Sequence, residues 1–274
     1  MINGLSKAVI PAGGLGMRMS GLTRGMPKEM LPVGHRPMIR WCIEEAFQSG
    51  IQKIAIILNK KKKSMQDYLA CPEIEGPHER ERVLQEAEQC RLTFIEQPTP
   101  RGSGDAIYLS RAFVGQEPFA VMMPDFLLFG SVPALRQMIE ATGQTGKSAV
   151  GFLRLSSPEA RNFGNVGVLK TEKVKGPIHQ VLNLSDKKPG PLMIEEGRQV
   201  LKAVGRLILD SGFFEMFADI SWNKTAELDD VPVIQRLVEK KSLFGIHLEG
   251  HGFDVGNPHG YRAANEYLKM HAHT

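Results

Sequence analysis

Three glycines and two cations near the start of the chain could together bind a polyphosphate. Gly13, Gly14 and Gly16 follow a short apolar run, and Arg18 and Lys28 come after the glycines. Glycine lets a backbone approach a ligand closely, and successive exposed N–H groups can cradle phosphate oxygens. The guanidinium and the ammonium add one forked and one compact cation. We therefore interpret this segment as a site for a nucleoside triphosphate.

Two commoner glycine motifs do not fit this segment. The dinucleotide-binding fingerprint requires a glycine three residues after Gly16, where this chain has Met19. A Walker A loop ends in Gly-Lys-Ser/Thr, which the segment lacks. For the glycines and the arginine alone, a glycine-rich strand-to-helix turn with surface cations remains the alternative interpretation.

Two later polar residues follow predicted strands and are candidates for ligand binding. Asp125 comes after the apolar run Phe119–Met123, and the carboxyl end of a parallel strand is where open α/β sheets bind ligands. Magnesium in such a site takes one or two carboxylates plus substrate phosphates. Gln97 follows the predicted strand Arg91–Ile95, and a glutamine amide there can read a base edge. A turn cap for Asp125 and a helix-capping loop after Gln97 are the structural alternatives.

The elements that position these side chains alternate as in an α/β protein. Apolar runs predict buried strands over Lys7–Pro11 and Lys53–Leu58, with a helix over Pro37–Gly50 between them. This order predicts a right-handed βαβ unit with parallel strands. The acidic segment 226–230 stands where a helix dipole favours negative charge. Further strands are predicted over 148–155, 165–170, 200–209 and 243–248, and helices over 211–218 and 228–241.

Length, charge and cysteine content exclude several classes of protein. A chain of 274 residues with 42% hydrophobic content can bury a large core, and a net charge of +4 suits anionic metabolites without indicating nucleic acid. Cys42, Cys71 and Cys90 form neither a disulfide framework nor a zinc ribbon. No apolar run reaches the roughly 20 residues that span a bilayer, and Met1–Ser6 is not a signal peptide. We expect a cytoplasmic protein with no membrane partner.

Two charged segments are interpreted as solvent-facing. The lysine run Lys60–Lys63 is typical of a solvated helix start, and it has no neighbouring aromatic residues that would stack on nucleic-acid bases. Residues Pro72–Gln89 are rich in Glu and Arg and poor in apolar residues, which predicts an exposed helical excursion.

Taken together, these motifs resemble the sugar-phosphate nucleotidyltransferase family, whose signature reads in outline AGxGTRxLPxTKxxPKEMLPV. Residues 12–18, AGGLGMR, and residues 27–33, PKEMLPV, match its two ends, and Met17 departs from the usual threonine. Glu29 favours the bacterial UTP–glucose-1-phosphate uridylyltransferase (UDP-glucose pyrophosphorylase) branch. The resemblance covers residues 5–269 and implies a Rossmann-like, GT-A-like α/β fold, with a mixed, mostly parallel sheet flanked by helices.

The resemblance also implies a reaction and its machinery. In this family an oxygen of a sugar 1-phosphate attacks the α-phosphorus of a nucleoside triphosphate, and pyrophosphate leaves. The implied substrates are UTP and glucose 1-phosphate, the product is UDP-glucose and the cofactor is Mg²⁺. Asp125 and Asp254 match the family's metal ligands. Arg18 is assigned to the departing pyrophosphate, Lys28 to the α- or β-phosphate and Lys188 to the sugar phosphate. No protein nucleophile is required.

The remaining expectations concern ligand contacts and organisation. We expect a single nucleotidyltransferase domain over residues 1–274, with a nucleotide-binding half over 1–130 and a sugar-phosphate-binding half over 131–274. We also expect a homo-oligomer, a dimer or tetramer, and no nucleic-acid partner. The other residues that the resemblance assigns to ligand binding are Ala12, Gly13, Gly14, Glu29, Gln97, Gly102 and Gly164.

One departure affects the predicted sugar site. The family's Glu-Lys-Pro triplet reads Lys187-Lys188-Pro189 here, so a cation stands where glutamate would bind sugar hydroxyls. Asp186 could substitute only if the backbone shifts by one residue. We therefore expect weaker discrimination among hexose 1-phosphates. A thymidylyl- or other sugar-1-phosphate nucleotidyltransferase, or a regulatory non-catalytic paralogue of the same fold, are the alternative functions.

Overall fold

The predicted βαβ unit is present at the N-terminal end of the described chain. Strand β1 (Lys7–Pro11) pairs in parallel with β4 (Lys53–Leu58), and helix α2 (Met38–Gln48) connects them. Ile10 joins the core on one face of β1 and Val9 joins the core on the other, as a continuous apolar strand predicts. This computed structural model describes residues 5–70, 90–143, 146–188, 190–217 and 228–271.

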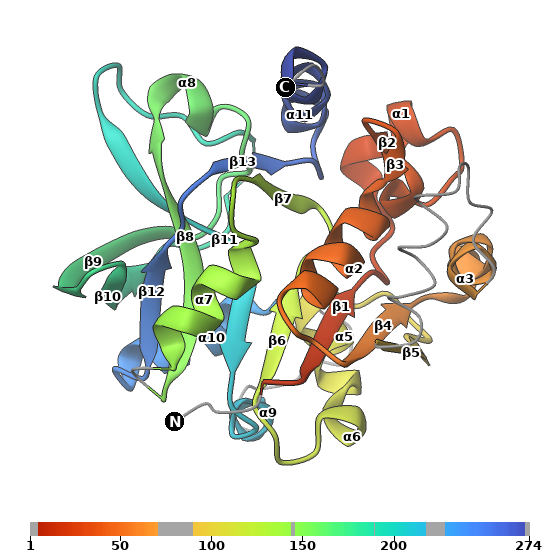
Figure 1. Ribbon diagram of the computed structural model, residues 1–274, viewed down its shortest axis with the longest axis horizontal. Coiled ribbons are helices and arrows are strands. Elements are labelled where there is room, and N and C mark those ends of the chain that lie inside the picture. Colours follow the sequence, from red (N-terminus) through yellow and green to blue (C-terminus); the bar gives the residue numbers. More distant parts are fainter. Residues whose placement is uncertain (1–4, 71–89, 144–145, 189, 218–227, 272–274) are drawn as a thin grey trace.

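The described residues form a nine-stranded mixed sheet in the order β5-β4-β1-β6-β11-β8-β12-β10-β9 (Figure 1). Strands β11 and β10 run opposite to the other seven, because their pairings with β6, β8 and β12 are antiparallel whereas β1–β6 and β8–β12 are parallel. The predicted fold class is confirmed. The other strands of this sheet are β5 (Arg91–Glu96), β6 (Phe119–Met122), β8 (Ser148–Ser156), β9 (Val168–Lys175), β10 (Ile178–Leu184), β11 (Gln199–Leu209) and β12 (Leu243–His247).

Helices cover both faces of the sheet and form two main cores. Helices α2 and α7 pack on one face, and helices α5, α9 and α10 pack on the other (Figure 1). Strand β11 lies between β6 and β8, so the N-terminal and C-terminal parts of the chain share one continuous sheet. The bounds of these helices are α5 (Ser103–Leu109), α7 (Ala134–Thr142), α9 (Phe213–Met216) and α10 (Val231–Glu239).

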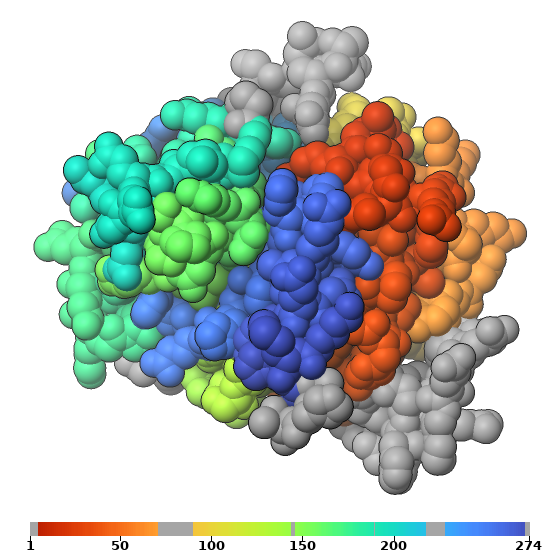
Figure 2. Space-filling model, turned by 90° about the horizontal axis from the view of Figure 1, so that it is seen from above, coloured from red at the N-terminus to blue at the C-terminus, as the bar shows by residue number. Residues whose placement is uncertain are grey.

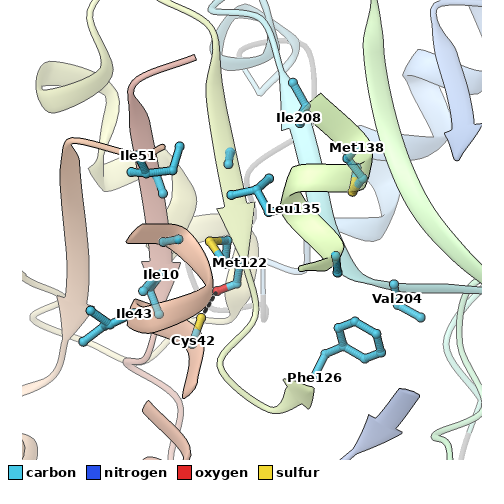
Figure 3. Packing of buried hydrophobic residues seen from close by; sticks show 14 of the residues in the cluster. Ile10, Cys42, Ile43, Ile51, Met122, Phe126, Leu135, Met138, Val204 and Ile208 are labelled. Carbon is cyan, nitrogen blue, oxygen red and sulfur yellow. Dashed lines mark hydrogen bonds between the residues drawn. The ribbon is translucent and has the colours of Figure 1, made fainter. Parts of the chain in front are cut away.

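The core under α2 contains a cysteine that serves as an apolar residue. Cys42 lies among Ile10, Met122 and other apolar side chains, with its Sγ 3.9 Å from the Met122 carbonyl oxygen (Figure 3). Burial raises the pKa of this thiol to about 12. Among the described residues, Cys42 and Cys90 are both buried and neither is part of a disulfide bond.

A third, smaller core is formed with the C-terminal helix, which lies against the N-terminal segment (Figure 2). Tyr261 Oη donates a hydrogen bond to the Pro32 carbonyl oxygen at 2.7 Å, and the Gly34 N–H donates to Asn265 Oδ1 at 2.9 Å. These bonds hold the turn that follows Lys28. The elements involved are β2 (Pro32–Val33), β3 (Arg36–Pro37), β7 (Phe126–Phe129), β13 (His251–Asp254) and α11 (Pro258–His271).

Several boundaries differ from the predictions. Helix α9 is a single turn, α10 begins at Val231 and β9 begins at Val168, because turns, bends or irregular backbone occupy the described parts of the predicted ends. The predicted excursion 72–89, together with Cys71, Pro189, Ala218 and residues 226–227, lies outside the described residues. Among the described helices, none is long and apolar enough to cross a membrane. The short helices are η1 (Met17–Met19), α1 (Ser20–Thr23), η2 (Lys28–Met30), η3 (Lys60–Lys62), α3 (Lys63–Ala70), α6 (Arg111–Val114) and α8 (Ser157–Ala160).

Candidate active site

A cavity of about 760 Å³ opens where β1 and β6 end, in the position where open α/β sheets bind ligands. Another cavity, of about 560 Å³, lies between segments 156–161 and 196–199 and contains none of the predicted site residues. All predicted site residues except Ala12 and Gln97 line the larger cavity, namely Gly13, Gly14, Arg18, Lys28, Glu29, Gly102, Asp125, Gly164, Lys188 and Asp254.

The glycine loop after β1 is supported from behind by buried side chains. Asn59 Nδ2 donates to the Gly13 carbonyl oxygen at 2.5 Å. The side chain of Gln97 is packed against Gly13, where an added Cβ would overlap the Gln97 amide oxygen. Ala12 is buried, and its N–H donates to the Ile57 carbonyl oxygen at 2.9 Å. Ala12 and Gln97 thus shape the loop from its inner side and do not face the cavity.

Gln97 also ties the glycine loop to the turn that opens α5. Its Nε2 donates to Asp105 Oδ2 at 2.8 Å and to the Gly102 carbonyl oxygen at 3.2 Å. Gly102 has a φ of 111°, a conformation that favours glycine. The predicted role of Gln97 in reading a base remains a prediction, since in this structure its amide nitrogen is engaged with the protein.

An ion pair between Lys28 and Asp125 stands in the cavity wall. Lys28 Nζ lies 2.5 Å from Asp125 Oδ2. Lys28 begins helix η2, and Pro27 before it limits the backbone freedom of this turn. Burial disfavours both charges, but each partner outweighs that effect, so the pKa of Lys28 is raised and the pKa of Asp125 is lowered. Both side chains are therefore charged at neutral pH.

Strand pairing between β7 and β13 brings Asp254 beside Asp125. Asp254 is paired with Phe126, and the Val255 N–H donates to the Asp125 carbonyl oxygen at 2.8 Å. A Cβ at Gly256 would overlap the Asp125 carboxylate, so only glycine fits at that position. The two predicted metal ligands, far apart in the sequence, thus meet through tertiary structure.

Asp254 has hydrogen-bond partners but no ion pair among the described residues. The Gly164 N–H donates to its Oδ2 at 2.9 Å, and the Gly256 N–H donates to its Oδ1 at 3.1 Å. Burial and the neighbouring charge of Asp125 raise the pKa of Asp254. An added Cβ at Gly164 would lie 3.3 Å from Arg18 Nη1 and 3.4 Å from Asp254 Oδ2, so the guanidinium reaches the same part of the cavity.

This pair of carboxylates is a donor set that fits a divalent cation. Asp125 has Lys28 as its counter-ion, whereas Asp254 forms no ion pair with a described residue and feels the charges of Arg18 and Lys202 only from farther away. In the part of the chain that the structure describes, no group of three His, Cys, Asp or Glu side chains is placed to hold a metal. Two carboxylates are nevertheless enough for Mg²⁺, which takes its other ligands from water and phosphate.

Glu29 forms an ion pair with Lys62, a lysine that was predicted to face solvent. Glu29 is 1% exposed, and its Oε2 lies 2.7 Å from Lys62 Nζ, which is also buried. The interpretation of Lys60–Lys63 as a solvated run is therefore wrong for Lys62, although the other three lysines are exposed. Burial lowers the pKa of Lys62, and the charge of Glu29 opposes that shift. A single buried lysine in a lysine run has no signal in sequence composition.

The part of the cavity that contains Lys188, predicted to bind the sugar phosphate, also contains carboxylates at the start of α10. Lys187 Nζ lies 3.0 Å from Asp229 Oδ2, and Ser103 Oγ bridges Asp229 and Asp230 at 2.8 Å and 2.7 Å. Burial and the Asp229 carboxylate raise the pKa of Asp230 to about 7. Hydrogen bonds from Asp230, Ser103 and Lys187 overcome burial and lower the pKa of Asp229 to about 2. The two carboxylates therefore share a proton near neutral pH.

Asp186 does not take the place of the family's glutamate in the cavity. Its Oδ1 accepts a hydrogen bond from Gln235 Nε2 at 2.8 Å, and it is exposed and absent from the cavity lining. Lys188 does line the cavity and is exposed, with its backbone N–H donating to the Asn165 carbonyl oxygen at 2.8 Å. Asp229 and Asp230, rather than Asp186, supply the carboxylates of this region.

Two buried cations near the site were not identified as functional from the sequence. Arg206 on β11 is fully buried and forms a forked ion pair with Glu45 at 2.8 Å and 2.6 Å. It also donates to the carbonyl oxygens of Met123 and Phe126 at 2.8 Å and 2.9 Å, on either side of Asp125. The available signal was a charged residue at an inward-facing position of an apolar strand. Lys202 lies earlier on the same strand and lines the cavity.

Comparison with known proteins gives a consistent result. Residues 7–270 match the model of the nucleotidyl transferase family. UTP–glucose-1-phosphate uridylyltransferase 2 of Staphylococcus saprophyticus is 30% identical over 94% of this chain and 89% of its own, and a UTP–glucose-1-phosphate uridylyltransferase of Bacillus subtilis is 32% identical over 93% and 88%. A crystal structure of a UDP-glucose pyrophosphorylase complexed with UDP-glucose has a TM-score of 0.80 and 26% identity, over 97% of this chain and all of that one.

Proposed function

Because this chain belongs to the nucleotidyl transferase family, we propose that it is a UTP–glucose-1-phosphate uridylyltransferase, which forms UDP-glucose and pyrophosphate. The observation that carries this proposal is that the glycine loop, the Lys28–Asp125 ion pair and Asp254 meet in one cavity. A cavity with these groups can bring two phosphorylated substrates together, which supplies much of the rate of a displacement at phosphorus.

The charges of the reaction match the charges of the cavity. An oxygen of glucose 1-phosphate attacks the α-phosphorus of UTP, and the bond to the departing pyrophosphate breaks. Arg18, beside the glycine loop, is the proposed partner of the departing pyrophosphate, and Lys28 is that of the α- or β-phosphate. Lys188, on the sugar side, is the proposed partner of the sugar phosphate. No side chain has to act as a nucleophile.

Asp125 and Asp254 are the proposed ligands of Mg²⁺. The support is chemical, since two neighbouring carboxylates, one of them in no ion pair with a described residue, provide the oxygen ligands that Mg²⁺ prefers. When bound, the ion would offset negative charge on the substrate phosphates. The protein's own contribution is to hold the two carboxylates by strand pairing and by the backbone N–H groups of Gly164 and Gly256.

The glycine loop, with Gly102 behind it, is the proposed nucleotide side of the cavity, and the region of Gly164 and Lys188 is the proposed sugar side. This arrangement agrees with one domain having a nucleotide-binding half over 1–130 and a sugar-phosphate-binding half over 131–274. Strand β11 supports the single domain, because it pairs with β6 of the first half and with β8 of the second and so joins the two halves in one sheet.

The test is pyrophosphate release with a matrix of substrates in the presence of Mg²⁺. UTP, dTTP, ATP and GTP are each combined with glucose, galactose and mannose 1-phosphate, and kcat/KM is measured for every pair. We expect UTP with glucose 1-phosphate to give the highest value. A higher value for dTTP would favour the thymidylyltransferase alternative. Nucleotide binding without release in any pair would favour a non-catalytic paralogue.

A further inference from the structure

Lys202 is a buried lysine in the wall of the cavity. It lies on β11 and is 6% exposed. Its Nζ donates to the Ala203 carbonyl oxygen at 2.5 Å and lies 5.9 Å from the centre of the Phe163 ring. An added Cβ at Gly167 would be 3.8 Å from the same nitrogen. Because Phe163, Gly167 and Ala203 all line the cavity, the ammonium group stands at the cavity surface.

The charge of Lys202 has no ion-pair partner among the described residues. An ammonium group has three N–H donors, and one carbonyl oxygen satisfies only one of them. Burial lowers the pKa of Lys202 to about 8, although the charges of Asp254 and Asp125 oppose that shift. Taking an ion out of water is unfavourable unless a partner compensates its charge. An anion that enters the cavity would provide that compensation.

Lys202 borders the same segment, residues 163–167, that the proposed sugar-phosphate site uses. The Ala203 N–H donates to the Gly167 carbonyl oxygen, and the Lys188 N–H donates to the Asn165 carbonyl oxygen, both at 2.8 Å. Two backbone segments that carry a lysine are therefore bonded to residues 163–167: β11 next to Lys202, and the turn that contains Lys188. Lys188 is exposed, whereas Lys202 is buried.

We propose that Lys202 is a second binding residue for the phosphate group of the sugar 1-phosphate, with Lys188 meeting that phosphate at the solvent side and Lys202 meeting it within the cavity. The inference rests on the proposed function and adds a residue to it. A dianionic phosphate offers several acceptor oxygens to the free donors of the ammonium. Ion pairing is also stronger in this water-poor position than at the exposed Lys188.

Other candidate ligands fit less well. In the proposed function the triphosphate of UTP already has its partners in the glycine loop, Arg18 and Lys28. Lys187, which stands nearer in sequence to Lys188, is held by Asp229. A sugar hydroxyl could accept a hydrogen bond from Lys202 but would leave its charge uncompensated. The sugar phosphate is the anionic group that remains.

The experiment compares Lys202→Met with Lys173→Met, in which an exposed lysine of β9 outside the cavity is changed. Binding of glucose 1-phosphate is measured calorimetrically with saturating Mg²⁺ and α,β-methylene-UTP, a UTP analogue that cannot release pyrophosphate. Binding of the analogue alone is measured separately. We expect Lys202→Met to weaken glucose 1-phosphate binding at least tenfold, to leave binding of the analogue within twofold, and to unfold at the wild-type temperature or above. Lys173→Met should match the wild type.

Three results would overturn this role. These are unchanged glucose 1-phosphate affinity in Lys202→Met, an equal loss of affinity for the UTP analogue, and no binding of any sugar 1-phosphate by the wild type. Lys202→Gln provides a second, polar replacement should the methionine variant fold poorly. Because the assay measures binding, it separates this inference from the proposed catalytic function. A protein that binds glucose 1-phosphate through Lys202 without turnover would contradict only the latter.

Discussion

Lys187 Nζ lies 3.0 Å from Asp229 Oδ2, so the cation that stands where the resembled family has a glutamate is paired with a carboxylate from another segment. Asp229 and Asp230 both line the cavity, and Ser103 Oγ contacts both. The proposed sugar side of the cavity thus contains carboxylate oxygens, contributed by the start of α10. This relationship changes which residues are expected to act on the sugar.

The first prediction concerns sugar selectivity. Asp229→Ala should lower kcat/KM for glucose 1-phosphate by about 10- to 100-fold, because a carboxylate acceptor is lost and Lys187 loses its ion pair with Asp229. The ratio of this kcat/KM to those for galactose and mannose 1-phosphate should fall in the same variant. Asp186→Ala is the matched control and should behave as the wild type, since Asp186 does not line the cavity. Unchanged ratios in Asp229→Ala would remove this carboxylate from sugar recognition.

The second prediction concerns the proposed metal ligands. Asp125→Asn and Asp254→Asn should each reduce turnover by about 10²-fold or more and raise the Mg²⁺ concentration needed for half-maximal rate, since an amide does not supply the charge. The Asp254→Asn variant should be at least as stable as the wild type, because burial and Asp125 already disfavour this charge. Thermal unfolding and direct Mn²⁺ titration separate metal loss from unfolding. Normal metal dependence in both variants would exclude these ligands.

The third prediction concerns the cations of the nucleotide side. Arg18→Ala and Lys28→Ala should reduce kcat by about 10²- to 10³-fold with a smaller change in UTP dissociation constant, since their charge is needed most as pyrophosphate separates. Lys60→Ala removes an exposed lysine and serves as the control. Single-turnover rates and equilibrium UTP binding are the two measurements. A loss confined to UTP affinity would show that these cations only bind the nucleotide.

The fourth prediction concerns the buried pair of Arg206 and Glu45. Glu45→Gln should lower the free energy of unfolding by about 3–5 kcal/mol, because it leaves Arg206 charged and fully buried without its carboxylate. The double variant Glu45→Gln with Arg206→Met should recover part of that loss. Urea denaturation measures both effects. Equal stability of Glu45→Gln and the wild type would show that the backbone carbonyl groups alone satisfy Arg206.

The fifth prediction concerns pH. The pKa of Asp230 is raised to about 7, whereas that of an unfolded aspartate is about 4. Between these values the folded chain keeps a proton that the unfolded chain loses, so the contribution of Asp230 to stability is full below pH 4 and declines as the pH rises towards 7. Asp230→Asn, which does not titrate, should therefore gain stability relative to the wild type across this window.

Urea unfolding at pH 4, 5.5, 7 and 8 measures the difference between Asp230→Asn and the wild type. The gain should reach about 1–3 kcal/mol at pH 8, less than the full shift implies because the residue is only half-buried. Asp186→Asn, at an exposed position, is the control. A difference that stays constant from pH 4 to 8 would contradict a shared proton between Asp229 and Asp230.

Local chemistry made much of this protein readable from its sequence. The runs Lys7–Pro11 and Lys53–Leu58 are strands with the predicted bounds, because a strand buried on both faces must be apolar throughout. The glycine loop and the turn at Gly102 were recognisable because close approach and positive φ select glycine. The parallel βαβ unit followed from the order of these elements, since the connections between parallel strands have a preferred hand. The mixed sheet was implied by the resemblance to the family.

Tertiary structure decided which charges meet. Nothing in the lysine run singled out Lys62 as the buried partner of Glu29, and nothing local to Lys187 pointed to Asp229. The residue types were visible in the sequence, but the partner of a charge is set by how distant segments pack, and it decides whether that charge is solvated, neutralised or left for a ligand. The sequence therefore determined the strands of the N-terminal βαβ unit, the glycine loop and the family. Only the folded chain determined that Asp254 stands beside Asp125 and that Lys202 faces the cavity without an ion-pair partner among the described residues.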